Sequence, residues 1–261
     1  MRTLIANRDL MSSMIRREIA GRYRGSVMGL AWSFFNPVLM LSVYTFVFSV
    51  VFKARWQGGS DSKTEFALIV FVGLILFNLF AESINRAPSL IVFNVNYVKK
   101  VIFPLELLSV ISFCSAAFHF LISLLVWIIF FCVFFGMPPL TIVYLPLIII
   151  PMVLYTLGLS WLLASLGVYI RDVAQFINVL MTVLMFLSPI FYPIASLPEQ
   201  YHLVMNINPL TFVVEQARDV MIFGGQLNWA LWLIQLLLSS LIAWLGFAWF
   251  QKTRKGFADV L

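Results

Sequence analysis

The 261-residue chain is 62% hydrophobic and 11% charged, with a formal net charge of +6 and two cysteines. An ordinary soluble domain has about 25% charged residues, so this composition excludes a soluble globular protein. Because about 20 apolar residues span the ~30 Å hydrocarbon layer of a bilayer, the long apolar segments predict an all-α membrane protein.

Six apolar segments are candidates for transmembrane helices. They cover residues 28–52, 66–82, 107–135, 142–170, 173–191 and 229–250. The run from 107 to 170 contains no Asp, Glu, Lys or Arg and is broken near its middle by Gly136-Met137-Pro138-Pro139. No room remains for a soluble domain, so residues 1–261 are expected to form one membrane domain.

Residues 1–26 precede the first span and contain a basic amphipathic stretch, 9–19, whose apolar side chains share one half of a helical wheel. Such a helix lies in the membrane surface with its Arg side chains at headgroup level. Glu18 precedes Arg22 by four residues, a spacing that favours an ion pair. The helix is predicted to be either an anchor or a docking surface for a cytoplasmic partner or an anionic lipid-linked substrate.

The first and fifth spans each carry a narrow polar stripe at helical spacing. The stripes consist of Ser33, Asn36 and Tyr44, and of Gln175, Asn178 and Thr182. Uncharged polar side chains in lipid need polar partners, so they serve as contacts between packed helices in many membrane proteins. They also suit a conduit for a polyhydroxylated substrate, because sugars offer hydroxyls for hydrogen bonds and C–H faces for stacking on rings. Both interpretations remain open on the sequence.

Residues 82–106 connect the second and third spans and carry Arg86, Lys99 and Lys100 around an apolar core, Leu90-Ile91-Val92-Phe93. A helix there combines charge with a hydrophobic face, which docking into a partner's groove requires. The alternative is a helix lying on the membrane surface.

His119 is the one titratable imidazole within the charge-free run. A lone buried histidine is more often a hydrogen-bonded packing residue than a proton relay, and its role stays open here. Cys114 and Cys132 fall on the same expected helix, about 27 Å apart at 1.5 Å per residue. They are therefore expected to form neither a disulfide nor a metal site.

Residues 193–228 mix Pro198, Pro209 and Gly224-Gly225 with apolar patches. This pattern predicts one or two short helices that re-enter the membrane or rest on its outer face. Two interpretations compete, a lid over a pore mouth and a packed surface loop.

The distribution of basic residues sets the expected orientation. With the N-terminus inside, the inner segments hold thirteen of the 17 Lys and Arg. The outer segments hold only Lys53, Arg55, Lys63 and Arg218. This positive-inside bias predicts that both termini are cytoplasmic. It also explains the net positive charge through membrane topology, so no nucleic-acid partner is expected.

The sequence lacks a G-x-x-x-x-G-K-[ST] phosphate loop, an H-E-x-x-H motif and a G-x-S-x-G motif. No charged side chain is expected in mid-membrane, where an ion-coupled carrier would need one. We therefore expect a transporter subunit rather than an enzyme, without a metal or cofactor of its own. Its energy is expected from a separate ATPase subunit that binds ATP and Mg²⁺.

Motifs along nearly the whole chain carry a resemblance to a known family. They are Arg16-Arg17-Glu18-Ile19, Arg22-Tyr23-Arg24-Gly25-Ser26, Gly29-Leu30-Ala31-Trp32, Asn36-Pro37, Asn94, Lys99-Lys100, Phe103-Pro104, Arg171-Asp172, Ser188-Pro189-Ile190-Phe191-Tyr192-Pro193, Asn208-Pro209-Leu210, Glu215 and Arg218. In order and spacing the chain resembles the membrane (permease) subunits of ABC transporters that export polysaccharides. The lipopolysaccharide O-antigen branch looks closest, and the capsular polysaccharide and teichoic acid exporters are related.

This resemblance implies a homodimer of six-helix subunits in the bacterial inner membrane, paired with two copies of a cytoplasmic ATPase. It implies a substrate that is a polysaccharide linked to an undecaprenyl-type lipid pyrophosphate and moved to the periplasm. The first and fifth spans would line the conduit. The coupling helix would contain Arg86, Asn94, Lys99 and Lys100. The periplasmic gate helices would contain Tyr192, Pro193, Asn208, Pro209, Glu215 and Arg218.

An anionic pyrophosphate requires donors at the inner mouth, and guanidinium groups match phosphate oxygens bidentately. Arg22, Arg24 and Arg171 are the candidates, since all three lie near the inner ends of predicted spans. Retention of positive charge on the inner side is the competing explanation.

Three other functions compete with polysaccharide export. One is an ABC permease for a drug or a small lipid, which copurified glycan would distinguish. Another is an intramembrane enzyme of lipid-linked glycan synthesis, which would need a carboxylate or metal cluster that the sequence lacks. The last is an ion-coupled carrier, which the charge-free membrane core disfavours.

Overall fold

The computed structural model describes residues 8–47, 63–99 and 103–261. The described residues form helices and connecting turns without any strand, which confirms the predicted all-α class. The α-helices are α2 (Arg8–Arg22), α3 (Trp32–Tyr44), α4 (Lys63–Arg86), α5 (Val95–Lys99), α6 (Leu107–Phe135), α7 (Leu145–Tyr169), α8 (Val173–Phe186), α9 (Glu199–Ile207), α10 (Pro209–Arg218), α11 (Trp229–Thr253) and α12 (Phe257–Val260).

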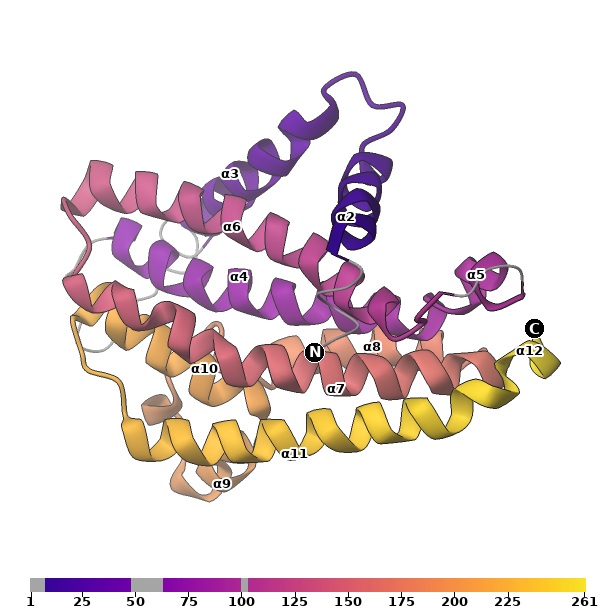
Figure 1. Cartoon of the computed structure of the whole chain (residues 1–261). Coiled ribbons are helices and arrows are strands. Elements are labelled where there is room, and N and C mark those ends of the chain that lie inside the picture. The colour runs from indigo at the N-terminus through magenta and orange to yellow at the C-terminus, as the bar shows by residue number, and fades with distance from the viewer. Residues whose placement is uncertain (1–7, 48–62, 100–102) are drawn as a thin grey trace.

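Five helical segments in the described part of the chain are long and apolar enough to cross a membrane. They are Gly29–Val47, Thr64–Ser89, Leu107–Phe135, Leu140–Tyr169 and Trp229–Val260. In Figure 1, α4, α6, α7 and α11 run lengthwise beside one another, while α2 and α3 project from this bundle as a hairpin. These segments match five of the six expected spans, although residues 48–52 of the first lie outside the described residues.

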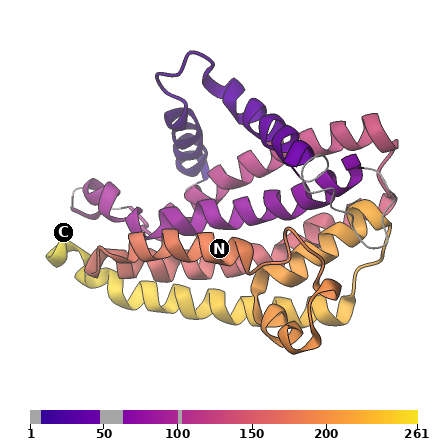
Figure 2. The ribbon, with the colours of Figure 1, turned by 180° about the vertical axis from the view of Figure 1, so that it is seen from behind.

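The sixth expected span, 173–191, is shorter than the sequence predicts. Its helix, α8, ends at Phe186 and has 14 residues, about 21 Å at 1.5 Å per residue. Proline cannot donate a backbone hydrogen bond and disfavours helical geometry in the residue before it, so Ser188-Pro189 ends the helix early. The chain then turns back into α9 and α10 (Figure 2).

Helix α4 occupies the centre of the molecule. In the segment Thr64–Ser89, 89% of the most apolar stretch is buried inside the molecule. Helix α4 contacts α3, α6, α7, α8 and α10. A helix that is apolar on all sides is expected to be buried on all sides. Trp127 of α6 adds a polar contact, donating from its indole nitrogen to the Leu68 carbonyl at 3.2 Å.

Glycines allow α7 to approach its neighbours closely. A Cβ atom added to Gly246 of α11 would lie 2.0 Å from the Gly158 carbonyl oxygen, and one added to Gly167 would lie 1.9 Å from the Pro88 carbonyl oxygen. These contacts hold α11 and the turn after α4 against α7. Small residues that let backbones meet are typical of membrane helix interfaces.

The segment 193–228 forms two short helices with different environments. Glu199–Ile207 is largely exposed, whereas Pro209–Arg218 packs deeply against α4 and α7. Of its residues, Leu210 to Val214 are all buried. Helix α10 is therefore part of the packed bundle, whereas α9 lies on its outside.

Arg218, which the sequence places in an outer segment, closes α10 and is 2% exposed. Its guanidinium donates to the carbonyls of Ile69 in α4 and of Pro189 and Ile190 in the turn after α8. Glu215 lies one helical turn earlier, 3.4 Å from the guanidinium. Three carbonyl oxygens and the Glu215 carboxylate thus surround the buried guanidinium.

Replacing Arg218 with Lys is expected to lower the free energy of unfolding by about 2–3 kcal/mol, the value of one or two hydrogen bonds to a charged group. The compact ammonium group keeps the charge but lacks the planar fork that reaches several carbonyls at once. Thermal unfolding of the purified protein in detergent measures the change. Arg254→Lys is the matched control, because this guanidinium is half-exposed and contacts Glu106 at 3.3 Å. Equal unfolding temperatures for the two variants would contradict the role of Arg218.

Candidate functional site

A cavity of about 1020 Å³ lies among α2, α3, α4 and α6. Helix α3 contributes the whole stripe expected to line a conduit in the first span, Ser33, Asn36 and Tyr44. Arg22, a candidate for headgroup binding, lines the same cavity from the end of α2. The structure therefore brings together two sets of residues to which the sequence assigned separate roles.

Helices α4 and α6 supply a second polar wall that the sequence analysis missed. Asn78, Glu82 and Asn85 recur at helical spacing on α4 and line the cavity opposite His119 and Ser123 of α6. The signal in the sequence is the spacing of four and then three residues on α4, which places these side chains on one face. The short second span is expected to extend past Glu82 at its cytoplasmic end, but the polar face that this extension gives to α4 was not recognised from the sequence.

The charged groups of the cavity form a connected cluster. Arg22 donates to the Glu82 carboxylate, and the two Glu82 oxygens lie 3.1 and 3.2 Å from Nδ1 of His119. Arg86 binds Glu18 at 2.8 Å. The pairing of Glu18 with Arg22, expected from their spacing in the sequence, is replaced by these two contacts from α2 to α4. Burial raises the pKa of Glu18, while Arg86 acts in the opposite direction.

His119 is a hydrogen-bonded member of this cluster, as expected for a buried histidine. Its Nδ1 atom also lies 3.0 Å from Nη1 of Arg22. Its Nε2 atom is buried and has no hydrogen-bond partner among the described residues. Since a guanidinium only donates, Nδ1 accepts a hydrogen bond from Arg22 or donates one to Glu82, but not both at once.

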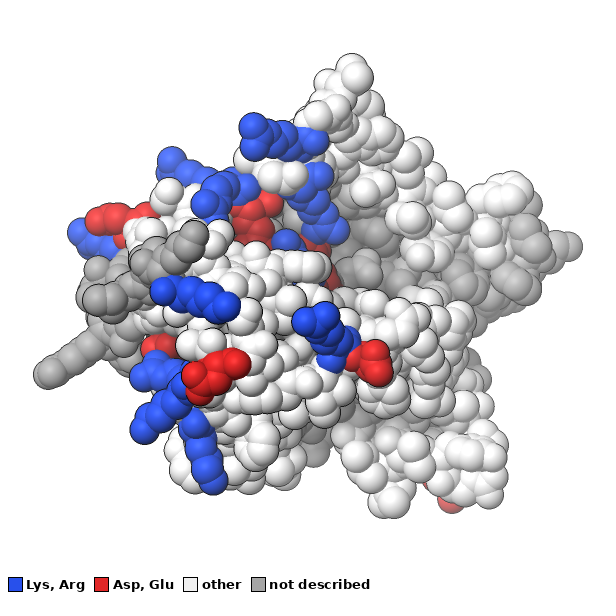
Figure 3. Space-filling view, turned by 90° about the vertical axis from the view of Figure 1, so that its right-hand side faces the viewer, with Lys and Arg blue, Asp and Glu red and all other residues white. Residues whose placement is uncertain are grey.

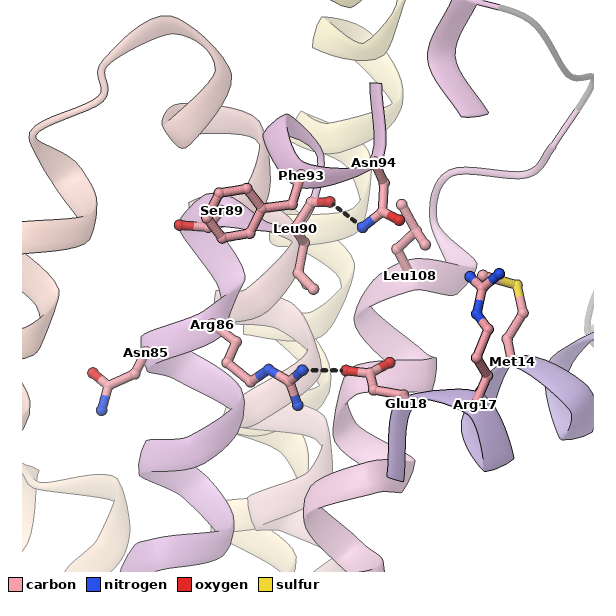
Figure 4. A pocket seen from close by; sticks show the side chains of 10 residues that line it. All are labelled: Met14, Arg17, Glu18, Asn85, Arg86, Ser89, Leu90, Phe93, Asn94 and Leu108. Atoms are coloured by element: carbon pink, nitrogen blue, oxygen red, sulfur yellow. Dashed lines mark hydrogen bonds and ion pairs between the residues drawn. The ribbon is translucent and has the colours of Figure 1, made fainter. Parts of the chain in front are cut away.

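A smaller pocket of about 400 Å³ lies beside the cavity, between α2 and the chain that follows α4 (Figure 4). Two of the expected coupling residues, Arg86 and Asn94, line it, and Asn94 donates to the Leu90 carbonyl at 2.8 Å. Glu18, Asn85 and Arg86 line both the pocket and the cavity. The ion pair between Glu18 and Arg86 therefore stands between the two spaces.

The segment 82–106 is a series of short helical turns followed by α5, rather than one continuous helix. Phe93 is 83% exposed, and Lys99 is exposed at the end of α5. Lys100, the fourth expected coupling residue, lies outside the described residues. The exposed Phe93 ring and the exposed Lys99 ammonium group are suited to contact with a partner protein.

Arg24, Arg171 and the α8 stripe do not line the cavity. Gln175, Asn178 and Thr182 are exposed on α8, which packs against α4 and α7. Helix α3 instead packs against α4 and α6. Within one chain the two polar stripes therefore lie on different sides of the molecule, and both Arg24 and Arg171 are exposed.

The residues expected to form a gate connect the end of α8 to α10. Asn208 caps α10 by accepting from the Leu210 amide at 3.0 Å and donates to the Ser188 hydroxyl at 2.9 Å. Pro209 occupies the first position of α10, which suits its fixed φ. The Tyr192 hydroxyl donates to the Phe186 carbonyl at 2.9 Å, and Pro193 follows it before a short helical turn.

Glu215 completes this set on α10, one turn before Arg218. Its carboxylate lies 3.4 Å from the Arg218 guanidinium. Together these contacts make the connection from α8 to α10 a braced structure rather than a free loop.

Lys and Arg side chains gather at one end of the molecule, which Figure 3 shows face on. We call it the basic end, because α5, which ends at Lys99, lies there beside the turn before α12, which contains Arg254 and Lys255. Among the described residues, no group of three or more His, Cys, Asp or Glu side chains is arranged to hold a metal ion.

Comparison with known proteins finds a matching family profile and several similar transport proteins. A family profile described as "ABC-2 type transporter" matches residues 9–222. The O-antigen export system permease protein RfbA of Klebsiella pneumoniae is 26% identical over 254 residues, which cover 97% of this chain and 95% of that protein. RfbA of Myxococcus xanthus is 27% identical over 261 residues, 99% of this chain and 97% of that protein. The polysialic acid transport protein KpsM of Escherichia coli is 24% identical over 223 residues, 82% of this chain and 81% of that protein.

Replacing Glu18 with Ala is expected to loosen α2 from α4, because it removes the contact to Arg86. A loss of about 1 kcal/mol raises the population of the detached form about fivefold. The rate of tryptic cleavage after Arg16 and Arg17 in the folded protein should rise by the same factor. Asp9→Ala is the control, since Asp9 is exposed and pairs only with its neighbour Arg8 among the described residues. Unchanged cleavage in Glu18→Ala would show that other contacts hold α2.

Proposed function

Because this chain belongs to the ABC-2 type transporter family, we propose that it is the channel-forming subunit of an ATP-driven polysaccharide exporter. Its substrate is an O-antigen type polysaccharide carried on a lipid pyrophosphate and moved across the bacterial inner membrane to the periplasm. The observation that carries this proposal is the cavity, which is lined by both the polar stripe of α3 and a cluster of charged residues. The matches to O-antigen export permeases along almost the whole chain support the substrate class.

The proposed topology has six crossings and both termini in the cytoplasm. Met14 of α2 and Phe257 of α12 belong to the same apolar cluster, so both terminal regions lie at the basic end. Chain ends on one side of a membrane require an even number of crossings. Five helices are long enough to cross alone, and α8 supplies the sixth crossing together with the turn after it and α10. The positive-inside rule places the basic end in the cytoplasm.

Two copies of the chain are needed for a complete conduit. Within one chain the α3 stripe faces the cavity, whereas the α8 stripe is exposed. Apolar side chains away from the stripe on α3, Phe34 and Phe35, are also exposed. A twofold dimer uses one surface patch of each copy and allows the α3 stripe of one subunit to face the α8 stripe of the other.

The energy for transport comes from two copies of a cytoplasmic ATPase that bind ATP and Mg²⁺. The described structure offers Phe93 and Lys99 at the basic end as contacts for this partner, because an exposed ring and a cation extend there from the segment after α4. Arg86 and Asn94 lie beneath them, in the pocket that adjoins the cavity. Movement of the partner against this segment would thus reach Arg86 and the ion pair at the wall of the cavity.

A second candidate is the export of a capsular polysaccharide. It is favoured by the match to the polysialic acid transport protein KpsM, which covers a smaller share of the chain than the O-antigen permeases do. Permeases for teichoic acid or for a smaller lipid or drug are further alternatives within the same mechanism. The glycan that copurifies with the complex distinguishes these substrates.

Cells that lack the chain are expected to lose their surface polysaccharide and to accumulate lipid-linked glycan on the cytoplasmic side. Surface glycan is measured by labelling intact cells, and the internal pool by extraction of lipid-linked glycan. The wild-type gene should restore export, whereas Lys99→Glu should restore it several-fold less well, because the reversed charge opposes docking of the ATPase. Lys63→Glu is the control, since residue 63 begins α4 at the end remote from α5. Normal surface polysaccharide in the deletion strain would refute the proposed function.

Cysteines placed in the polar stripes should report the conduit. In a background without Cys114 and Cys132, Asn36→Cys and Asn178→Cys should react with a membrane-impermeant thiol reagent when export is stalled with the channel open. Phe35→Cys and Leu180→Cys are the matched controls, because they lie on the opposite faces of the same helices, and they should stay protected although both positions are exposed in one chain. Equal protection at all four positions would show that the stripes only join helices.

A further inference from the structure

We propose that the charged cluster of the cavity is an anion-binding site that the protein's own Glu82 carboxylate occupies at rest. The pyrophosphate of the lipid carrier binds Arg22 and Arg86 by displacing this carboxylate. The identity of the anion rests on the proposed function, whereas the site and its internal occupant rest on the geometry of the cluster.

The two guanidinium groups are placed to receive a ligand from the cavity. Arg22 comes from the end of α2 and Arg86 from the end of α4, and both line the cavity. Their side chains are 47% and 40% exposed, whereas the Glu82 side chain between them is 17% exposed. The donors therefore reach the open space while the carboxylate lies behind them, and guanidinium groups bind phosphate oxygens bidentately.

The charges of the resting cluster cancel, so a new anion has to displace a carboxylate. Arg86 is bound by Glu18 at 2.8 Å and lies 3.9 Å from Glu82. Arg22 is bound by Glu82 alone among the described acidic residues. Glu82 is thus the carboxylate that both guanidinium groups share, and its release is what exposes the pair to a phosphate group.

His119 makes this exchange possible without leaving a buried charge unpaired. A buried carboxylate that loses its partner is strongly destabilising. When Arg22 turns toward the phosphate, the imidazole of His119 changes tautomer, its proton moving from Nε2 to Nδ1 through solvent. Nδ1 then donates to Glu82, whose oxygens already lie 3.1 and 3.2 Å away. The competition of Arg22 and Glu82 for one nitrogen atom is therefore resolved by the ligand.

Isothermal titration calorimetry of the full chain in nanodiscs tests the proposal with inorganic pyrophosphate and geranylgeranyl pyrophosphate as probes. Glu82→Gln keeps the size of the side chain and removes the competing charge. It should tighten binding by about tenfold, the lower end of what a hydrogen bond to a charged group contributes. Glu106→Gln is the matched control, because it removes the partner of Arg254 outside the cavity and should leave binding unchanged.

Arg22→Gln should weaken binding, and in that background Glu82→Gln should have a smaller effect, because one of its two competing partners is gone. Tighter binding of geranylgeranyl pyrophosphate than of inorganic pyrophosphate supports the carrier headgroup as the ligand, and equal binding supports a site for free phosphate groups. Unchanged or weaker binding in folded Glu82→Gln protein, or no binding of either probe to any variant, overturns the proposal.

These results are independent of the export assay. A chain that is required for surface polysaccharide but shows no tightening in Glu82→Gln refutes the displacement and leaves the proposed function standing. A chain that binds the probes as expected but is dispensable for surface polysaccharide refutes the proposed function and leaves the anion site standing.

Discussion

The Arg218 guanidinium is the contact on which the arrangement around the central helix depends. A buried turn has no water to bind its backbone carbonyls, so it needs donors from the protein. Arg218 supplies them to Pro189 and Ile190 and also reaches Ile69 of α4. A Cβ atom at Gly73 would lie 2.8 Å from Nη2 of Arg218, so the glycine provides the space. Helix α8 can therefore end early, and α10 can occupy the position that a longer helix would fill.

The same physical constraint explains the charged cluster at the other side of α4. Carboxylates and imidazoles within a membrane segment are costly, and they are retained where they pair with one another or face a water-filled cavity. Glu82 and His119 satisfy both conditions, because they bind each other and line the cavity beside Arg22. The cluster also joins α2 to α4 and α6. A ligand that changes one of these pairs thereby changes how the projecting hairpin of α2 and α3 is attached to the bundle.

Much of the architecture and part of the site follow from local sequence patterns. Apolar runs of sufficient length predict the helices, and the helical spacing of Ser33, Asn36 and Tyr44 predicts a polar face that the structure places in a cavity. The cluster was not predictable in this way, because its partners are remote in the sequence. Arg22 meets Glu82 across 60 residues, and Glu82 meets His119 across 37. Local spacing favoured an ion pair between Glu18 and Arg22, which the tertiary contacts with α4 replaced.

The sequence by itself determined that this chain is a helical membrane protein, where most helices lie, and that positive charge gathers at one end. These properties depend on hydrophobicity and charge, which each residue carries regardless of its neighbours. Only the tertiary structure decided which polar groups are paired, because pairing depends on distances between helices that no local period encodes. It buried Arg218, which the sequence assigned only to an outer segment, and made Glu82 the partner of Arg22 and His119. Burial and partnership, rather than residue type, thus distinguish a charge that marks topology from one that forms a site.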